Sequence, residues 1–265
     1  RMKAEKDGDE WVLNGQKVWT SGAHFADYGM VVARSDPSAL KHKGLTYFFL
    51  DMKTPGVEAK PIKQISGSAN FNEVFFNDVR IPDSQRLGAE GDGWKVALTT
   101  LMNERLAVGD PPGLDFDQIF EATKEIEVED GLAIKNSEVR QKMADWYVQS
   151  RGLQYTKYRS MTALSKGQTP GPELSISKLV TASKMQEVSS YALDLMDMAG
   201  YVHHDKNPVM RNLFQNGYFF SAAMRIAGGT DEVLRNIIAE RVLGLPQDER
   251  PDKKVPFNEL PSGKN

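Results

Sequence analysis

Four consecutive residues near the start of the chain, Trp19, Thr20, Ser21 and Gly22, combine an indole, two hydroxyls and a glycine. They come directly after a sequence that predicts a β-hairpin. A strand that only packs into a sheet does not need this mixture. An aromatic wall beside short hydrogen-bonding groups instead suits a flat ligand with polar edges. The segment is therefore a candidate binding site.

A carboxylate lies on a predicted helix over residues 93–108. Steps of about 100° per residue place five apolar residues on one face of this helix: Trp94, Ala97, Leu98, Leu101 and Val108. Arg105 falls in the middle of the face and Glu104 at its edge, although charged side chains are rarely buried without a partner. The charges either bond a neighbouring helix or the sheet, or they border a cavity. In an apolar cavity, desolvation raises the pKa of a carboxylate, which suits Glu104 to accept a proton from carbon.

Two glycines, Gly228 and Gly229, precede a third candidate site. Thr230 follows as a good helix N-cap, and Asp231 and Glu232 lie in the first turn of the predicted helix. As pure structure this is an ordinary helix start. Alternatively, residues without side chains permit a ligand to approach the backbone, and the helix N-terminus offers free N–H groups to an anion or a carbonyl.

Composition excludes several classes of function. The chain has 265 residues, 40% of them hydrophobic, which predicts a sizeable core and about two domains. A net charge of −3 argues against nucleic acid as the main partner, and no apolar run approaches the roughly 18 residues of a membrane span. The absence of cysteine excludes disulfides and thiol catalysis and favours the cytoplasm. The four histidines show no metal-ligand spacing, so we expect no metal site: His24, His42, His203 and His204.

The elements that must position these residues divide into two parts. The first, up to Pro82, is rich in short strand patterns, and the pair Asn14-Gly15 predicts a hairpin turn. From Gly93 onward the period becomes helical, with helices predicted over 93–108, 138–166, 173–198, 208–224 and 231–243. The acidic run at 121–131 predicts a solvated helix or a mobile connection. We expect a small β-barrel domain over residues 1–88 packed on a helical bundle over residues 89–265.

Five stretches, taken in order, resemble the middle and carboxy-terminal domains of the acyl-CoA dehydrogenases: "GQKVWTSGAHFADYGMVVARSD", "GLTYFFLDMKTPGVE", "FNEVFFNDVRIP", "GDGWKVALTTLMNERLAVG" and "IAGGTDEVLRNIIAERVLGLP". The resemblance implies this family's α+β multidomain fold, with an amino-terminal helical domain expected upstream of this chain. It implies an oxidoreductase of fatty acid and lipid metabolism. It also implies FAD as the cofactor.

The resemblance assigns roles to the candidate residues. The segment Trp19, Thr20 and Ser21 matches the part that packs along the isoalloxazine ring, with a hydroxyl near the flavin N5 and O4 edge. Three residues match positions that touch the FAD of this or a neighbouring subunit: Thr230, Asp231 and Glu232. Five match the wall of the acyl-CoA site: Met102, Asn103, Arg105, Gly228 and Gly229.

The position of the catalytic base is informative. The family reaction removes the α-proton of an acyl-CoA thioester with a glutamate while the β-hydrogen leaves as hydride to flavin N5, which gives a trans-2-enoyl-CoA. Many members carry the base just before the "GT" that opens the last helix, where this chain has Gly228. Members resembling isovaleryl- and long-chain-type enzymes carry it just before an arginine on an earlier helix. Glu104, followed by Arg105, matches that position.

The resemblance also implies partners and leaves alternatives. It implies an acyl-CoA with a medium, branched or ring-bearing chain, electron-transfer flavoprotein as the electron acceptor, and a homodimer or homotetramer. The motif that binds the flavin adenine from another subunit is not evident in residues 131–160, where Arg140 is a candidate substitute. One alternative is a non-catalytic subunit of a heteromeric dehydrogenase. The other is a flavin oxidase or monooxygenase, which needs an aspartate base absent from the matched positions.

Overall fold

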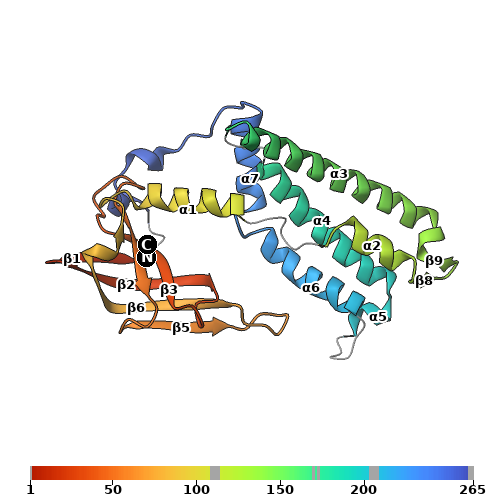
Figure 1. Ribbon diagram of the computed structural model, residues 1–265, viewed down its shortest axis with the longest axis horizontal. Coiled ribbons are helices and arrows are strands. Elements are labelled where there is room, and N and C mark those ends of the chain that lie inside the picture. Colours follow the sequence, from red (N-terminus) through yellow and green to blue (C-terminus); the bar gives the residue numbers. More distant parts are fainter. Residues whose placement is uncertain (1, 108–113, 169–170, 172–173, 203–208, 262–265) are drawn as a thin grey trace. The chain divides into compact units, whose positions relative to one another are not determined.

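The computed structural model describes the backbone of residues 2–107, 114–168, 171, 174–202 and 209–261, and their side chains except at 102–107, 174, 209–211 and 251. The chain forms two compact units (Figure 1). Unit 1 comprises Arg1–Gly109 with Asp248–Asn265, and unit 2 comprises Asp110–Gln247. A β-rich part followed by a helical part is therefore confirmed. The division into domains after residue 88 stays a prediction.

Unit 1 contains a seven-stranded mixed sheet of order β5-β6-β2-β1-β3-β4-β7. Its strands are β1 (Lys3–Asp7), β2 (Glu10–Ser21), β3 (Tyr28–Arg34), β4 (Leu45–Asp51), β5 (Val57–Ile62), β6 (Phe71–Pro82) and β7 (Arg86–Leu87), with the 3-10 turn η1 (Asp83–Gln85) before β7. The pairs are antiparallel except β1 with β3. Alternate residues of the strands point inward, and Trp11, Phe48 and Leu50 are among the fully buried side chains of this core.

The hairpin predicted at Asn14-Gly15 is wrong, because β2 runs through this pair without turning. The turn between β1 and β2 lies instead at Gly8, which has a φ of 62°. Asn14 is held by Asp78 of β6: its Nδ2 donates to Asp78 Oδ1 at 2.9 Å, and its Oδ1 accepts from the Asp78 N–H at 3.0 Å. The register of β2 against β6 shifts between Leu13 and Gly15, so the pair forms a β-bulge rather than a turn.

Helix α1 (Gly93–Ala107) packs on the β3 and β4 side of unit 1. A Cβ at Gly93 would lie 2.6 Å from the carbonyl carbon of Thr46, so only glycine lets the helix start this close to β4. Of the predicted apolar face, Ala97 is buried, whereas Trp94, Leu98 and Leu101 are exposed by 40–45%. Val108 lies outside the described residues. The large apolar side chains of this face are therefore only partly buried within unit 1.

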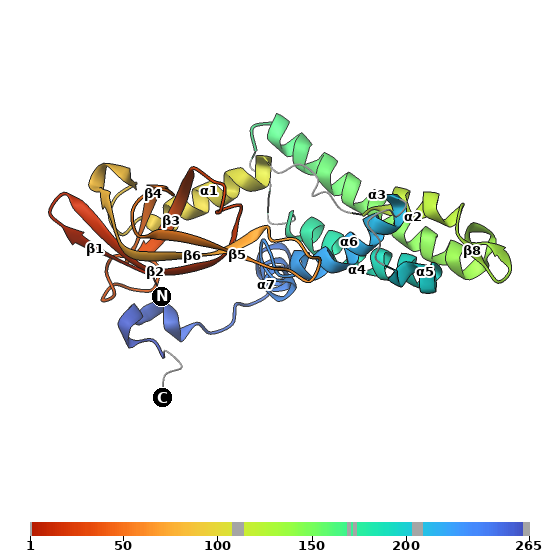
Figure 2. The ribbon, with the colours of Figure 1, turned by 90° about the horizontal axis from the view of Figure 1, so that it is seen from below.

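The carboxy-terminal segment of unit 1 lies against the loop that precedes β4 (Figure 2). It contains the 3-10 turns η4 (Pro251–Lys254) and η5 (Phe257–Glu259). The Arg34 guanidinium lies 3.9 Å from the centre of the Phe257 ring, the Phe257 N–H donates to the Ala39 carbonyl, and Lys41 pairs with Asp252. The two ends of the described chain thus meet in one unit.

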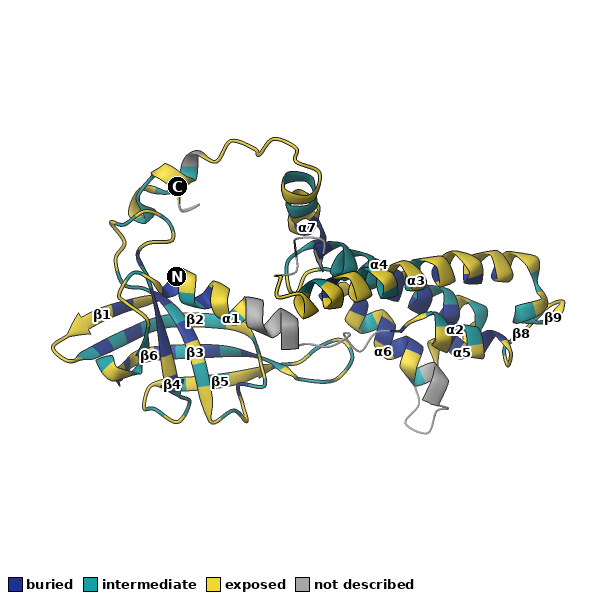
Figure 3. Cartoon of the chain, turned by 45° about the horizontal axis from the view of Figure 1, so that its top comes forward, coloured by how far each residue is buried: buried dark blue, intermediate teal, exposed yellow. Residues whose placement is uncertain are grey.

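Unit 2 is helical. Its elements are α2 (Phe116–Thr123), β8 (Glu127–Val128), β9 (Gly131–Leu132), η2 (Ala133–Lys135), α3 (Ser137–Ser165), α4 (Leu174–Leu195), α5 (Met198–Tyr201), α6 (Val209–Met224), α7 (Asp231–Ile237) and the π-helical turn η3 (Ile238–Val242). Helices α3, α4 and α6 agree with the predicted ranges to within a few residues, and α7 together with η3 covers most of the range predicted over 231–243. The short helix α5 was not predicted. The end of α2 and the small β8–β9 hairpin lie in the acidic run 121–131, where a solvated helix or a mobile connection was predicted. Burial is concentrated along α4, where it contacts α3 and α6 (Figure 3). Among the described residues, no helix has the length and apolar character needed to cross a membrane.

An ion pair between a buried lysine and a half-exposed aspartate fixes the start of α2 in unit 2. The Lys184 side chain is 2% exposed, and its Nζ donates to Asp115 Oδ1 at 2.6 Å and to Ser150 Oγ at 2.8 Å. Asp115 also caps α2, with its carboxylate accepting from the Phe116 N–H. Desolvation alone would raise the pKa of Asp115, but the hydrogen bonds from Lys184 and Ser150 outweigh it and lower the pKa.

The two partners of this pair differ in exposure, so their removal has unequal effects. Asp115→Asn keeps the helix cap but leaves the buried Lys184 ammonium without a counter-charge, and we expect a loss of about 2–3 kcal/mol in the free energy of unfolding. Lys184→Met leaves a carboxylate that is 54% exposed and can be solvated, so about 1 kcal/mol is lost. Urea unfolding followed by circular dichroism measures both. Equal losses, or a larger loss for Lys184→Met, would contradict this asymmetry.

Two controls accompany this comparison. Lys124→Met removes an exposed ion pair with Glu121 and should change the free energy of unfolding by less than about 0.5 kcal/mol. Because the folded pKa of Asp115 is lowered, the contribution of the pair is present above the ordinary aspartate pKa and is lost as pH falls through the folded value. The difference between wild type and Asp115→Asn should therefore shrink on acidification.

Candidate functional site

The end of β2 presents Trp19 to solvent. Its backbone has a φ of 61°, a left-handed conformation that is unusual for a bulky residue, and its side chain is 63% exposed. The β2–β6 register shifts between Lys17 and Thr20, so Trp19 lies in the irregular part of the ladder. The indole meets the Phe71 ring edge to face, with 6.1 Å between the ring centres. The backbone therefore turns the indole out of the sheet, where one face is available to a ligand.

A buried asparagine holds this irregular segment in place. The Asn72 side chain is fully buried, its Nδ2 donates to the Thr20 carbonyl at 2.9 Å, and its Oδ1 lies 3.0 Å from His24 Nδ1. Asn72 thereby connects β6 with both sides of the Thr20–His24 turn. It was not among the residues predicted from the sequence, because its partner is a main-chain carbonyl 52 residues away.

The two hydroxyls next to the indole are available for a ligand. Within the part of the chain that the structure describes, neither the Thr20 Oγ1 nor the Ser21 Oγ forms a hydrogen bond. Gly22 has a φ of 66°, and a Cβ there would lie 2.7 Å from the Phe25 ring. The segment thus combines an exposed ring, two unoccupied hydroxyls and a tight turn that only glycine accommodates.

The predicted acid on α1 can be placed only by its backbone. Glu104 lies in the last turn of α1, together with Met102, Asn103 and Arg105. The side chains of these four residues lie outside the described ones, so their roles stay predictions.

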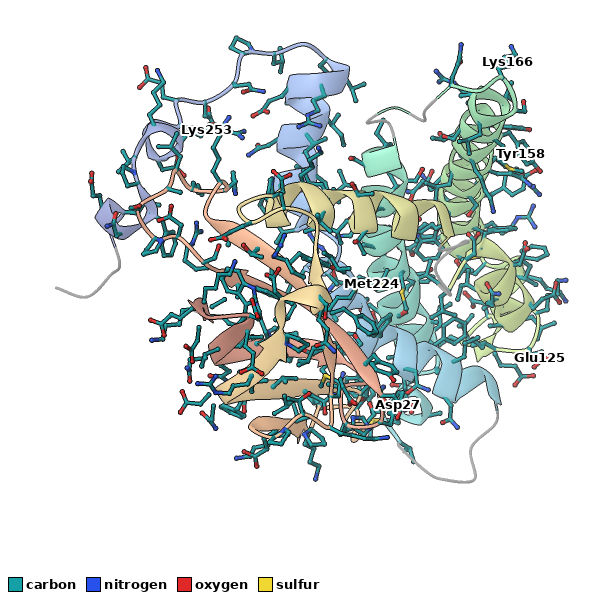
Figure 4. The ribbon with its side chains drawn as sticks, turned by 60° about the vertical axis from the view of Figure 1, so that its left-hand side comes forward. Asp27, Glu125, Tyr158, Lys166, Met224 and Lys253 are labelled. Carbon is teal, nitrogen blue, oxygen red and sulfur yellow. The ribbon has the colours of Figure 1, made fainter. Side chains whose placement is uncertain are left out.

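In unit 2, the candidate site predicted at Gly228 and Gly229 is a left-handed turn between α6 and α7. Met224, which ends α6, is labelled in Figure 4. Gly228 and Gly229 have φ values of 65° and 102°, and a Cβ on Gly228 would meet nothing within 4 Å. Thr230 caps α7, its Oγ1 accepting from the Val233 N–H at 3.3 Å. No hydrogen bond to any described residue occupies the N–H groups of Gly228, Gly229 and Thr230, so this turn offers donors to an anion or a carbonyl.

The next two residues face in different directions. The Asp231 side chain is 2% exposed, and its carboxylate bonds inside unit 2 to Arg225. Glu232 is exposed, and hydrogen bonds from its own N–H and from Thr230 lower its pKa. Glu232 is therefore accessible to a ligand, whereas the buried Asp231 carboxylate binds Arg225 at the other end of the turn.

Other features of the described residues do not compete with these segments. No group of three or more histidine, aspartate or glutamate side chains there has the geometry to hold a metal ion. A shallow hollow of about 430 Å³ lies along the end of α3, beside Tyr158 and Lys166 (Figure 4), and contains none of the predicted residues.

Comparison with known proteins identifies both parts of the chain. Residues 1–79 match the family model "Acyl-CoA dehydrogenase, middle domain", and residues 91–243 match "Acyl-CoA dehydrogenase, C-terminal domain". Acyl-CoA dehydrogenase FadE34 of Mycobacterium tuberculosis is 35% identical over 93% of this chain and 33% of its own length. Acyl-CoA dehydrogenase IpdE1 of the same organism is 37% identical over 93% of this chain and 63% of its own length. The chain thus spans only part of the length of these relatives.

Solved structures show the same fold. The chain is similar to a structure titled "Tcur3481-Tcur3483 steroid ACAD", with a TM-score of 0.79 and 24% identity over 93% of this chain and 64% of that one. It is also similar to the ChsE4-ChsE5 complex from Mycobacterium tuberculosis, with a TM-score of 0.76 and 23% identity over 94% of this chain and 65% of that one. The chain belongs to the acyl-CoA dehydrogenase family, whose members are FAD-dependent flavoproteins.

Proposed function

We propose that the full-length protein catalyses the FAD-dependent α,β-dehydrogenation of an acyl-CoA thioester to a trans-2-enoyl-CoA. The observation that carries this proposal is the Trp19–Ser21 segment, where a left-handed backbone holds an indole outward beside two unoccupied hydroxyls. A packed strand gains nothing from such a conformation, which is stabilised only when the surroundings enforce it. A flat ring with polar edges fits it.

The residues present fit FAD. Trp19 supplies an aromatic wall, and Thr20 and Ser21 supply short donors for the polar edge of the ring. In unit 2, Thr230 and the exposed Glu232 match family positions that touch the FAD of this or a neighbouring subunit, and both offer polar groups at the start of α7. When bound, the flavin supplies the acceptor for the β-hydride, and these residues orient it and tune its electronics.

Glu104 is proposed as the acceptor of the α-proton. It lies on a regular helix, where a glutamate needs no special backbone conformation. Gly228, at the other family position for the base, has no side chain. The free N–H groups of the turn at Gly228–Thr230 are suited to hold the thioester carbonyl, which makes the α-proton more acidic.

The remaining assignments follow the family. We propose an acyl-CoA with a medium, branched or ring-bearing chain as substrate, electron-transfer flavoprotein as the electron acceptor, and a homodimer or homotetramer as the assembly. A non-catalytic subunit of a heteromeric dehydrogenase is the alternative that the missing carboxylate at residue 228 favours. Anaerobic titration of the full-length protein with a panel of acyl-CoAs separates the two, because only a catalytic subunit bleaches its flavin.

Replacing Glu104 by glutamine tests the base. Glu104→Gln keeps the size and hydrogen-bonding capacity of the side chain but removes proton acceptance. FAD content and acyl-CoA binding should stay near wild type, while the rate of flavin bleaching falls by at least about 10²–10⁴-fold. Glu129→Gln, at an exposed position of unit 2, is the matched control and should bleach normally. Bleaching of Glu104→Gln at the wild-type rate would show that another group takes the proton.

Substitutions of Trp19 distinguish the contribution of its ring to FAD retention from the effect of its left-handed backbone on stability. Trp19→Ala and Trp19→Gly both remove the indole, so both should weaken FAD retention by about tenfold or more. In the apoprotein, Trp19→Gly should be more stable than Trp19→Ala by about 1 kcal/mol, because glycine adopts a φ of 61° without strain. FAD absorbance after gel filtration and urea unfolding measure the two effects. Trp19→Phe should retain most of the flavin, and full retention by Trp19→Ala would argue against an aromatic wall at this position.

A further inference from the structure

A group of charges centred on one buried carboxylate lies beside the turn at Gly228–Thr230. The Asp231 cluster consists of Asp231 at the start of α7, Arg225 just after α6, and Lys178 and Gln186 of α4. Arg225 Nε donates to Asp231 Oδ2 at 2.6 Å, and Arg225 Nη1 donates to Gln186 Oε1 at 2.7 Å. Lys178 Nζ lies 3.6 Å from Asp231 Oδ1. Two cations thus meet one carboxylate that is 2% exposed.

The cluster closes the turn at both ends. The Asp231 N–H donates to the Arg225 carbonyl at 3.1 Å, so main-chain and side-chain bonds join the same two residues across the turn. Between them, Lys178 Nζ donates to the Gly229 carbonyl at 2.7 Å. This bond from a neighbouring helix holds the main chain of a residue that has no side chain of its own to hold it.

The Lys178 bond determines where the N–H of the next residue points. A trans peptide is planar, so the Gly229 carbonyl and the Thr230 N–H point in opposite directions. With the carbonyl held on Lys178, the Thr230 N–H faces away from it, and no described residue occupies that donor. One of the two dihedral angles that flank this peptide belongs to Gly229, which rotates easily, so the Lys178 bond restrains a flip of the peptide.

The hydrogen bonding of Asp231 is incomplete. Its Oδ1 has no hydrogen-bond partner among the described residues, although buried polar atoms are nearly always paired. The Lys178 ammonium pairs with this oxygen only at 3.6 Å, whereas its hydrogen bond to the Gly229 carbonyl is 2.7 Å long. The closer contact of Lys178 is therefore with the main chain of the turn.

We infer that Lys178 is a positioning residue, which holds the Gly229–Thr230 peptide so that the Thr230 N–H is aimed at the carbonyl of the bound acyl-CoA. This inference rests on the proposed function. Arg225 and Asp231 hold the ends of the turn, and Lys178 sets the orientation of the peptide between them.

The first test needs no activity. Lys178→Met keeps most of the side-chain length but loses the donor, and Lys178→Arg keeps a donor. In the full-length protein, hydrogen–deuterium exchange of the hydrogen-bonded amides of Ala227 and Asp231, which flank the free N–H groups of the turn, should rise at least tenfold in Lys178→Met and less in Lys178→Arg, with exchange in α3 unchanged. Lys142→Met, at an exposed position of α3, is the control. Unchanged exchange in the turn of Lys178→Met would overturn the inference.

The second test measures whether the turn donates a hydrogen bond to the thioester carbonyl of the acyl-CoA. An acyl-CoA thioether, which lacks the carbonyl oxygen, is compared with the corresponding saturated thioester. Wild type should bind the thioester more tightly, and Lys178→Met should lose most of this preference while binding the thioether as before. The kcat should fall by about tenfold to hundredfold and KM change less, because a carbonyl donor acts mainly in the transition state.

The outcomes distinguish a failure of the Lys178 role from a failure of the proposed function. Faster exchange in the turn with unaltered kcat and thioester preference would show that the turn does not hold the carbonyl, which overturns the inference but leaves the proposed function standing. If no acyl-CoA of the panel bleaches the wild-type flavin, the proposed function fails, and this inference fails with it.

Discussion

The pairing of β2 with β6 is the contact on which the rest of unit 1 depends. These two strands supply a large share of its buried core, including Trp11, Leu13, Val74, Val79 and Ile81. The register of their ladder shifts at two places. At each place a side chain of β6, Asp78 or Asn72, forms hydrogen bonds with β2. A slip of one residue in register would turn every inward side chain outward, so burial of the core fixes the register and leaves the irregularities in definite places.

Both units build their candidate binding segment in the same way. A short piece of backbone in the left-handed region carries the outward-facing groups, and a polar side chain of a neighbouring element donates a hydrogen bond to its main chain. In unit 1 the segment contains Trp19, and Asn72 grips the Thr20 carbonyl. In unit 2 it contains Gly228 and Gly229, and Lys178 grips the Gly229 carbonyl. Local sequence does not favour either conformation, so tertiary contacts must hold both.

This division explains what the sequence could and could not predict. Hydrophobic periodicity predicted the long helices α3, α4 and α6 of unit 2 to within a few residues, but not the short helices α2 and α5. The Asn14-Gly15 pair, a common hairpin signal, forms a bulge here, where Asn14 bonds the Asp78 side chain. The sequence also did not reveal the roles of Asn72 and Lys178, whose main-chain partners lie 52 and 51 residues away. A main-chain carbonyl carries no side-chain identity, so such a contact leaves no signature in a single sequence.

The glycine at residue 228 is consistent with separate tasks for the turn and for the proposed base. At a φ of 65°, any residue with a Cβ is strained, and a glutamate there would have to serve as base from that strained position. On α1, a glutamate occupies a regular helical backbone and carries no such strain. With the base on the helix, the turn retains two glycines and needs only to present its N–H groups. Those groups are useful only if the peptide is held in one orientation, and the Lys178 bond to the Gly229 carbonyl meets that requirement.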